Sequence, residues 1–139
     1  MHRWNEFPHD NQPFTVPGRQ LQDAWDDLHR GDCEPFPTDD DLQEAWRCFH
    51  RGDFQEATER ADAIGEAAHA VANKATGISA TYLEGDQKRQ IGCYKSAIER
   101  GERAIKAFPD DANSHYFHAF NLGRYSQSIS IVKALKQGI

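Results

Sequence analysis

Residues 21–32 of this chain return almost unchanged as residues 42–53. Both stretches begin with Leu-Gln, an acidic residue, Ala and Trp, and both end with His-Arg-Gly-Asp. Such internal self-similarity usually means that one supersecondary unit is stacked several times, so it constrains the fold more than any other feature. We therefore predict a repetitive architecture for this chain of 139 residues, a length that fits one domain.

Apolar residues recur at intervals of three and four after residue 18, which is the spacing of one helix face. No strand pattern is found, so we predict an all-α fold. Glycines that can adopt the left-handed C-cap conformation follow four of the expected helices, at Gly31, Gly52, Gly85 and Gly123. The seven expected helices span about residues 19–30, 40–51, 54–66, 70–84, 87–107, 112–122 and 125–136.

Residues 1–18 combine prolines with aromatic residues such as Trp4 and Phe7. This composition is too rich in proline for a helix and too aromatic for a solvated tail. We predict an irregular arm that lies over the helices.

The spacing of three of these glycines is typical of a known repeat. Gly52, Gly85 and Gly123 are 33 and 38 residues apart, close to the period of about 34 residues of tetratricopeptide repeats. The turn Gly52-Asp53-Phe54 followed by Ala57 resembles the turn inside such a repeat, and Gly123-Arg124-Tyr125 followed by Ser128 resembles a weaker copy. Ala97, Ala104 and Pro109 fit the end of the middle unit. Over residues 40–136 the chain thus resembles the tetratricopeptide repeat (TPR) family, and residues 119–127 are similar to uncharacterised bacterial TPR proteins.

The resemblance implies antiparallel helical hairpins that stack as a right-handed superhelix. It places a capping helix at residues 19–31 and hairpins at residues 40–68, 70–109 and 111–136 of a helical domain that spans residues 19–139. It also implies a non-catalytic scaffold that binds a peptide or a partner protein through its concave face or its C-terminal end.

Bulky residues three and six positions before the glycines form a stripe along the expected helices. Such a stripe is either hydrophobic core or the wall of a binding groove, because equivalent positions of stacked units line one concave surface. The polar residues Asn73, Lys74, Asn113 and Arg47 lie about one helical turn from it. The partner-binding candidates are Trp25, Trp46, Phe49, Tyr82, Asn113 and Phe117.

The last expected helix presents Ile129, Ile131, Val132 and Leu135 without a polar capping helix after them. Terminal repeats normally carry a polar outer face, so we expect this surface to be covered. A second copy of the chain, a partner protein or further sequence could cover it, and these residues are therefore candidates for self-association or docking.

Two alternatives to a scaffold follow from the sequence. His115 and His118 are three residues apart on one expected helix and could share a metal ion with Asp110 or Asp111, as in a small metal-dependent enzyme or regulator. The chain could also be a fragment of a longer repeat protein.

His29 and His50 precede helix ends, where we expect dipole and surface contacts. We find no catalytic or cofactor motif and predict that the protein is not an enzyme and has no cofactor.

Composition restricts the classes of partner molecule and the cellular compartment that we expect. The net charge of −6 repels phosphate backbones and anionic membranes, so we expect neither nucleic acid nor membrane as a partner. The sequence contains no secretory signal and no apolar stretch of membrane-spanning length. Its three cysteines lack metal-binding spacing and fit a reducing compartment, which predicts a cytoplasmic protein.

Overall fold

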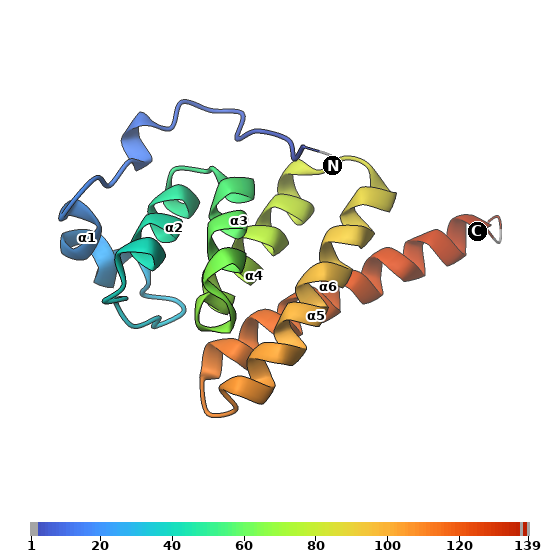
Figure 1. Ribbon diagram of the computed structural model, residues 1–139. Helices are drawn as coiled ribbons and strands as arrows, with labels where there is room; N and C mark the ends of the chain where they lie inside the picture. Colours follow the sequence, from blue (N-terminus) through green and yellow to red (C-terminus); the bar gives the residue numbers. More distant parts are fainter. Residues whose placement is uncertain (1–2, 137, 139) are drawn as a thin grey trace.

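The computed structural model describes residues 3–136 and 138, and this part of the chain contains helices but no strand (Figure 1). The all-α prediction is confirmed. The described residues form six α-helices, α1 (Gln20–Leu28), α2 (Asp40–His50), α3 (Phe54–Ile64), α4 (His69–Ile78), α5 (Gln87–Ala107) and α6 (Ala112–Lys136). Three short turns complete the fold, the 3₁₀ turns η1 (Gln12–Phe14) and η2 (Glu66–Ala68) and the π-helical turn η3 (Ser79–Leu83).

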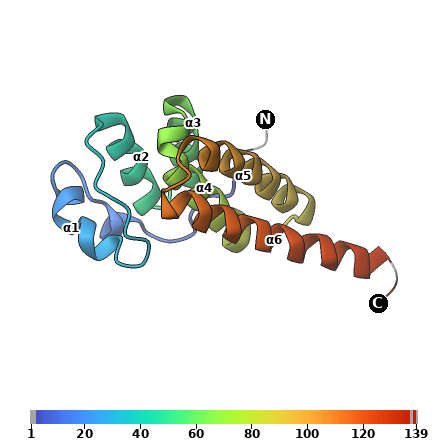
Figure 2. The same cartoon turned by 90° about the horizontal axis from the view of Figure 1, so that it is seen from below.

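The prediction of two helices after residue 111 is wrong, because α6 runs through Gly123 without a break (Figure 2). A glycine inside a helix costs about 1 kcal/mol relative to alanine, which is less than the packing of one large side chain contributes. Phe117 and Ser128, on either side of Gly123, are both buried. Tertiary packing therefore outweighs the local preference, and residues 111–136 form a single helix instead of a hairpin.

The ends of the first two helices also differ from each other. Gly52 adopts a φ of +91° after α2, which is the predicted left-handed conformation. After α1, Gly31 has no positive φ, and Cys33 takes a φ of 53° in its place. The predicted left-handed glycine is thus present at Gly52 and wrong at Gly31 and at Gly85, which also has no positive φ.

Helix α4 lies at the centre of the fold and packs against α2, α3, α5 and α6. It is rich in small residues, and its side chains Val71, Ala72 and Ala75 are almost completely buried. A β-carbon at Gly77 would lie 2.6 Å from the Asn121 side chain, and the same approach occurs between Gly101 of α5 and His118. Small residues therefore allow α4 and α5 to approach α6 closely.

The N-terminal arm crosses the α2–α3 turn and reaches the end of η3, which continues α4 (Figure 1). The Trp4 backbone N–H donates to Gln55 Oε1 at 2.8 Å, and Asn5 Nδ2 donates to the Leu83 carbonyl at 2.8 Å. The Phe7 ring lies against Gly52, where a β-carbon would come within 2.6 Å of Phe7 Cγ. The arm is thus held by both hydrogen bonds and ring packing.

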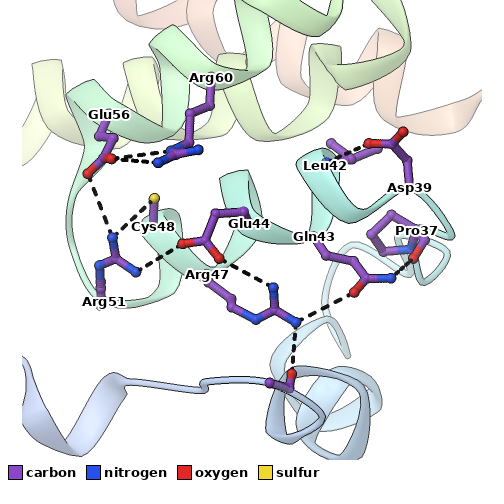
Figure 3. Close-up of polar contacts among 11 residues, drawn as sticks. Pro37, Asp39, Leu42, Gln43, Glu44, Arg47, Cys48, Arg51, Glu56 and Arg60 are labelled. Carbon is purple, nitrogen blue, oxygen red and sulfur yellow. Dashed lines mark hydrogen bonds and ion pairs between the residues drawn. The ribbon is translucent and has the colours of Figure 1, made fainter.

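Polar contacts along α2 hold the N-terminal arm on one side and α3 on the other (Figure 3). The Asp39 side chain accepts a hydrogen bond from the Leu42 N–H at 2.9 Å and caps the helix. Arg47 donates to the Gly18 carbonyl at 2.8 Å, which ties the end of the arm to α2. On the other side, Arg51 lies 3.6 Å from the Glu56 carboxylate of α3.

A second polar contact joins α3, α4 and α5. Arg100 is buried, and its guanidinium makes two hydrogen bonds to the Asp62 carboxylate at 2.8 and 2.9 Å. It also donates to Asn73 Oδ1 at 2.8 Å. Because a bidentate guanidinium contact fixes geometry, Arg100 holds these three helices in register.

Candidate functional site

A cavity of about 250 Å³ opens between the end of α1, the middle of α4 and the first half of α6. Its walls are apolar, and the charged side chains of Asp32 and Lys74 lie at its base, since both are largely buried. Tyr116 is exposed at its rim. We call this cavity the groove, and its lining residues are Leu28, Gly31, Asp32, Lys74, Ile78, Tyr116, Phe117 and Phe120.

The ammonium group of Lys74 is held by one carboxylate and three aromatic rings. Lys74 Nζ donates a hydrogen bond of 2.7 Å to Asp32 Oδ2. It also lies 5.2 Å from the centroid of the Phe49 ring and 5.9 Å from the centroids of Trp46 and Phe117. Aromatic faces attract a cation, so the rings compensate in part for its lost hydration.

Asp32 is the centre of a hydrogen-bond network at the base of the groove. Besides Lys74, it accepts the backbone N–H of Glu34 at 3.1 Å and His29 Nδ1–H at 2.9 Å. Burial disfavours the ionised carboxylate, but the hydrogen bonds, above all that from Lys74, outweigh burial and hold the Asp32 pKa below its usual value. Asp32 is therefore an ionised carboxylate beneath the groove.

Behind Asp32, the buried ring of His29 pairs with the half-buried ring of His50. His29 Nε2 and His50 Nε2 are 3.0 Å apart, so one of them must donate a proton to the other. Because Asp32 occupies Nδ1–H of His29, the neutral His29 ring offers Nε2 as an acceptor, and His50 Nε2–H is the donor. The His29 ring stacks on Trp25, with centroids 3.7 Å apart, and meets the Trp46 ring edge to face.

Burial keeps both imidazoles neutral. It lowers the pKa of His29, although Asp32 opposes the change, and together with the neighbouring His29 and Lys74 it lowers the pKa of His50 to about 3. The expectation of a surface contact near a helix end is therefore wrong for His29, which is buried, whereas His50 is half-buried in the last turn of α2. The pair is an internal hydrogen-bonded link between α1 and α2.

The loop after α1 is fixed to α6 through Asn113. Asn113 Nδ2 donates to the Asp32 carbonyl at 3.0 Å and to Glu34 Oε2 at 2.6 Å. Burial, followed by the negative charges of Asp111 and Asp32, raises the pKa of Glu34 to about 7, although the hydrogen bond from Asn113 opposes this. The Trp25 indole N–H donates to the Glu34 carbonyl at 2.7 Å. These contacts set the position of Asp32 relative to α6.

The predicted partner-binding residues separate into two groups. Trp25, Trp46, Phe49 and Phe117 are buried, so the aromatic stripe is core at these positions, which was one of the two alternatives. Asn113 is also buried and contacts the loop after α1. Tyr82 differs because it is 69% exposed.

The polar residues expected near the stripe lie in different places. Lys74 lines the groove, as expected for a polar groove residue. Asn73 instead faces Arg100, and Arg47 binds the arm through the Gly18 carbonyl. Helical spacing alone did not show which of them face the cavity.

The two histidines proposed as metal ligands have other contacts. His115 Nε2 donates to the Pro109 carbonyl at 2.7 Å. His118 packs against Gly101, and its Nδ1 is buried without a hydrogen-bond partner. Within the described residues, no group of three or more His, Cys, Asp or Glu side chains is arranged to hold a metal ion. The geometry therefore gives no support to the metal-dependent alternative.

Sequence reasoning missed two features of the groove. Asp32 was interpreted only as part of the helix stop, because its partner Lys74 lies 42 residues further along the chain. Tyr116 was not among the predicted site residues, and the structure places it at the groove rim. The sequence signals for this site were Lys74 and Phe117, which were singled out by their helical spacing and do line the groove.

Comparison with known proteins gives no relative for this site. No protein-family model matches the sequence, and neither a curated protein nor a solved structure matches the chain. Of the helices in the described residues, none combines the length and the apolar character needed to cross a membrane. The function must therefore be argued from the groove itself.

Proposed function

We propose that this protein is a non-catalytic, TPR-like interaction module that binds an extended or helical segment of a partner protein in the groove. The observation that carries the proposal is an apolar cavity with exposed Tyr116 and Leu28 at its edge and the Lys74–Asp32 pair at its base. Apolar walls with a few fixed polar groups are typical of recognition sites.

The order of helix packing supports the TPR-like assignment. Helix α4 packs against α2 and α6 as well as against α3 and α5, its neighbours in sequence. In a stacked array of hairpins, the first helix of each unit packs on the first helix of the next and lines the concave face. Here α2, α4 and α6 take those places, with α3 and α5 as second helices. The groove then belongs to the concave face.

The lining indicates the chemistry of the bound segment. Leu28, Ile78 and Phe120 favour an apolar anchor side chain, because burial of an aliphatic or aromatic side chain contributes about 1.5–3 kcal/mol. Lys74 has N–H donors beyond the one that binds Asp32, and these fit a carbonyl acceptor on the partner. We assign no catalytic role to the site and no cofactor, since its charged groups bind one another.

We place the module in the cytoplasm. The thiols of Cys33, Cys48 and Cys93 are all unpaired, which fits a reducing compartment. Burial also raises the pKa of Cys48 to about 11, so this thiol stays protonated and packs as a small apolar side chain.

Selection from a displayed library of random peptides tests the proposal. Peptides selected on the purified protein should carry an apolar anchor and should lose at least about tenfold in affinity for Tyr116→Asp or Leu28→Asp, because a charge would then face the bound apolar residue. Leu122→Asp is the matched control, since Leu122 is also an exposed apolar residue of α6 but does not line the groove. Thermal unfolding confirms that each variant is folded. Selected peptides that bind all three variants equally would refute the groove as the site.

A further inference from the structure

The C-terminal half of α6 carries an apolar face that leaves the body of the protein. Residues 117, 121, 128, 131 and 135 follow one another at intervals that keep them on one side of the helix. Phe117, Asn121 and Ser128 are buried, whereas Ile131 and Leu135 are 53% and 66% exposed. Both views show the C-terminal end of α6 projecting past the other helices (Figures 1 and 2). The face that forms core up to Ser128 is therefore open to solvent at Ile131 and Leu135.

Helix α6 differs from the rest of the chain in its charged residues. All 22 acidic residues precede Ala112, together with 13 of the basic residues. Helix α6 contains Arg124, Lys133 and Lys136 and no carboxylate side chain. Its projecting end is thus an apolar helix with basic residues in an otherwise acidic protein, and an acidic apolar surface complements it.

The groove has an apolar lining and acidic residues beside it. Leu28 at its edge directly follows Asp26 and Asp27 of α1, which are both exposed, and Asp27 forms an exposed ion pair of 2.8 Å with Arg30. The walls accept apolar side chains, as argued for the proposed function. A helix that presents apolar residues at intervals of three and four fits such a groove.

We propose that the end of α6 of one molecule docks in the groove of a second copy of the chain. Ile131 and Leu135 lie against the apolar walls, and Lys133 and Lys136 face Asp26 and Asp27 of the neighbour. This inference rests on the proposed function, because it names one occupant of the same groove.

The occupant must come from another molecule. Tyr116, Phe117 and Phe120 of α6 line the groove themselves, and a continuous helix cannot fold back onto its own first half. Side-by-side pairing of two α6 ends would bring basic residues together, whereas head-to-tail docking pairs opposite charges. A head-to-tail contact leaves one groove and one helix end free, so it can extend to longer assemblies. Self-association and binding of another partner then compete for the groove.

Two double variants, each with one of the two docking surfaces blocked, test this arrangement. Ile131→Asp with Leu135→Asp blocks the helix end, and Leu28→Asp with Tyr116→Asp blocks the groove. In sedimentation velocity at low ionic strength, the average mass of the unaltered protein should rise with concentration, and added salt should lower it. Each blocked variant should be monomeric, because its association is weakened at least about tenfold. An equimolar mixture of the two should form a one-to-one complex, since each retains one intact surface. Leu122→Asp, on the same helix, should associate like the unaltered protein.

Other outcomes would overturn the inference. It fails if the unaltered protein is monomeric at every concentration that stays in solution, if either blocked variant still associates, or if the mixture does not assemble. It also fails if the helix end instead binds anionic phospholipid vesicles in a manner that needs Ile131 and Lys133. If self-association is absent but displayed peptides still need Tyr116 and Leu28, the inference fails and the proposed function stands. If no peptide needs these residues either, both fail.

Discussion

The two copies of the repeated stretch, in α1 and α2, contact each other through equivalent residues. His29 and His50 hold the same position in the two copies, and their Nε2 atoms are 3.0 Å apart. Trp25 and Trp46 are likewise equivalent, and their rings meet edge to face with centroids 5.5 Å apart. The repeat therefore packs against itself, and much of the core at this end of the fold consists of one motif used twice.

The same motif nevertheless has different surroundings in the two copies. Leu28 is 39% exposed at the groove, whereas its equivalent Phe49 is 8% exposed. The reason is position, since α2 packs against α3 and α4 while α1 lies at the outer edge of the helices (Figure 1).

The acidic residue that ends each copy differs in the same way. Asp32 is buried, with 4% of its side chain exposed, and pairs with Lys74, whereas Asp53 is 41% exposed and pairs with its neighbour Arg51. Position in the fold, more than sequence, determines whether a residue of the motif is buried at the base of the groove or lies at the surface.

Replacement of the two tryptophans should give the largest difference between the copies. Trp46→Ala should lower the free energy of unfolding by about 3–5 kcal/mol, because Trp46 is almost completely buried and contacts rings of both copies. Trp25→Ala should cost less, since α1 has solvent on its outer side. Urea unfolding of both variants measures the difference. Equal losses would show that α1 is as much a part of the core as α2.

The two terminal aspartates should differ by a smaller amount. Asp32→Asn should cost about 2–3 kcal/mol, because it leaves Lys74 without its carboxylate in a largely buried setting. Asp53→Asn should cost less than about 1 kcal/mol, since its pair with Arg51 is partly exposed. The double variant Asp32→Asn with Lys74→Met, compared in urea with each single variant, isolates the coupling. A coupling near zero would contradict the network described at the base of the groove.

The histidine pair should make folding stability sensitive to acid. The folded protein keeps His29 and His50 neutral, with pKa values below the usual 6.5, so below that pH the unfolded chain binds protons that the folded chain does not. Stability should therefore fall as the pH drops from about 6.5, and for His50 alone the loss at pH 5 is about 2 kcal/mol. The variant His50→Gln keeps an N–H donor toward His29 and removes one titration. Its stability relative to the original protein, measured by urea unfolding, should improve by that amount between pH 7 and pH 5. A constant difference would show that His50 titrates in the folded protein as it does in the unfolded chain.

The smallest expected effect concerns a residue just after the first copy. Glu34 lies two residues beyond Asp32, as Gln55 lies two residues beyond Asp53, and its pKa is raised to about 7. A carboxyl group with a raised pKa destabilises the fold as the pH rises from 4.5 toward 7, because the unfolded chain releases the proton first. Glu34→Gln should thus stabilise the protein at pH 5.5 by about 1.4 kcal/mol, because this pH lies one pKa unit above the unfolded value of 4.5, and should show almost no gain at pH 4. Urea unfolding at the two pH values checks this, and a gain of equal size at both would exclude the titration as its cause.

Much of the helical layout could be predicted from the sequence because local patterns determine it. The expected helix at residues 87–107 coincides with α5 (Gln87–Ala107), since apolar spacing and flanking turn residues agree there. At Gly123 the local pattern was misleading, because packing of Phe117 and Ser128 against other helices holds α6 together. Local signals therefore predict helices well and helix interruptions poorly.

The candidate site was harder to predict because its key contacts are long-range. The Asp32–Lys74 pair joins residues 42 positions apart, and Asn113 reaches Glu34 from 79 positions away. The sequence offered the right residue types but no indication that they meet. It also could not separate core from groove in the aromatic stripe, because both alternatives need bulky residues at the same helical spacing.

Two glycines set the direction of α6, because α6 packs closely on α4 and α5 at these positions. Its close crossings, Gly77 with Asn121 and Gly101 with His118, both lie in its first half. At 1.5 Å per residue, Leu135 is about 21 Å from Asn121 along the axis, so a tilt of about 5° at the crossings would move Leu135 by about 2 Å. A β-carbon at either glycine must push α6 away from its neighbour. Gly77→Ala or Gly101→Ala would therefore redirect the distant end of α6, and a change deep in the core would reach a surface that it does not touch.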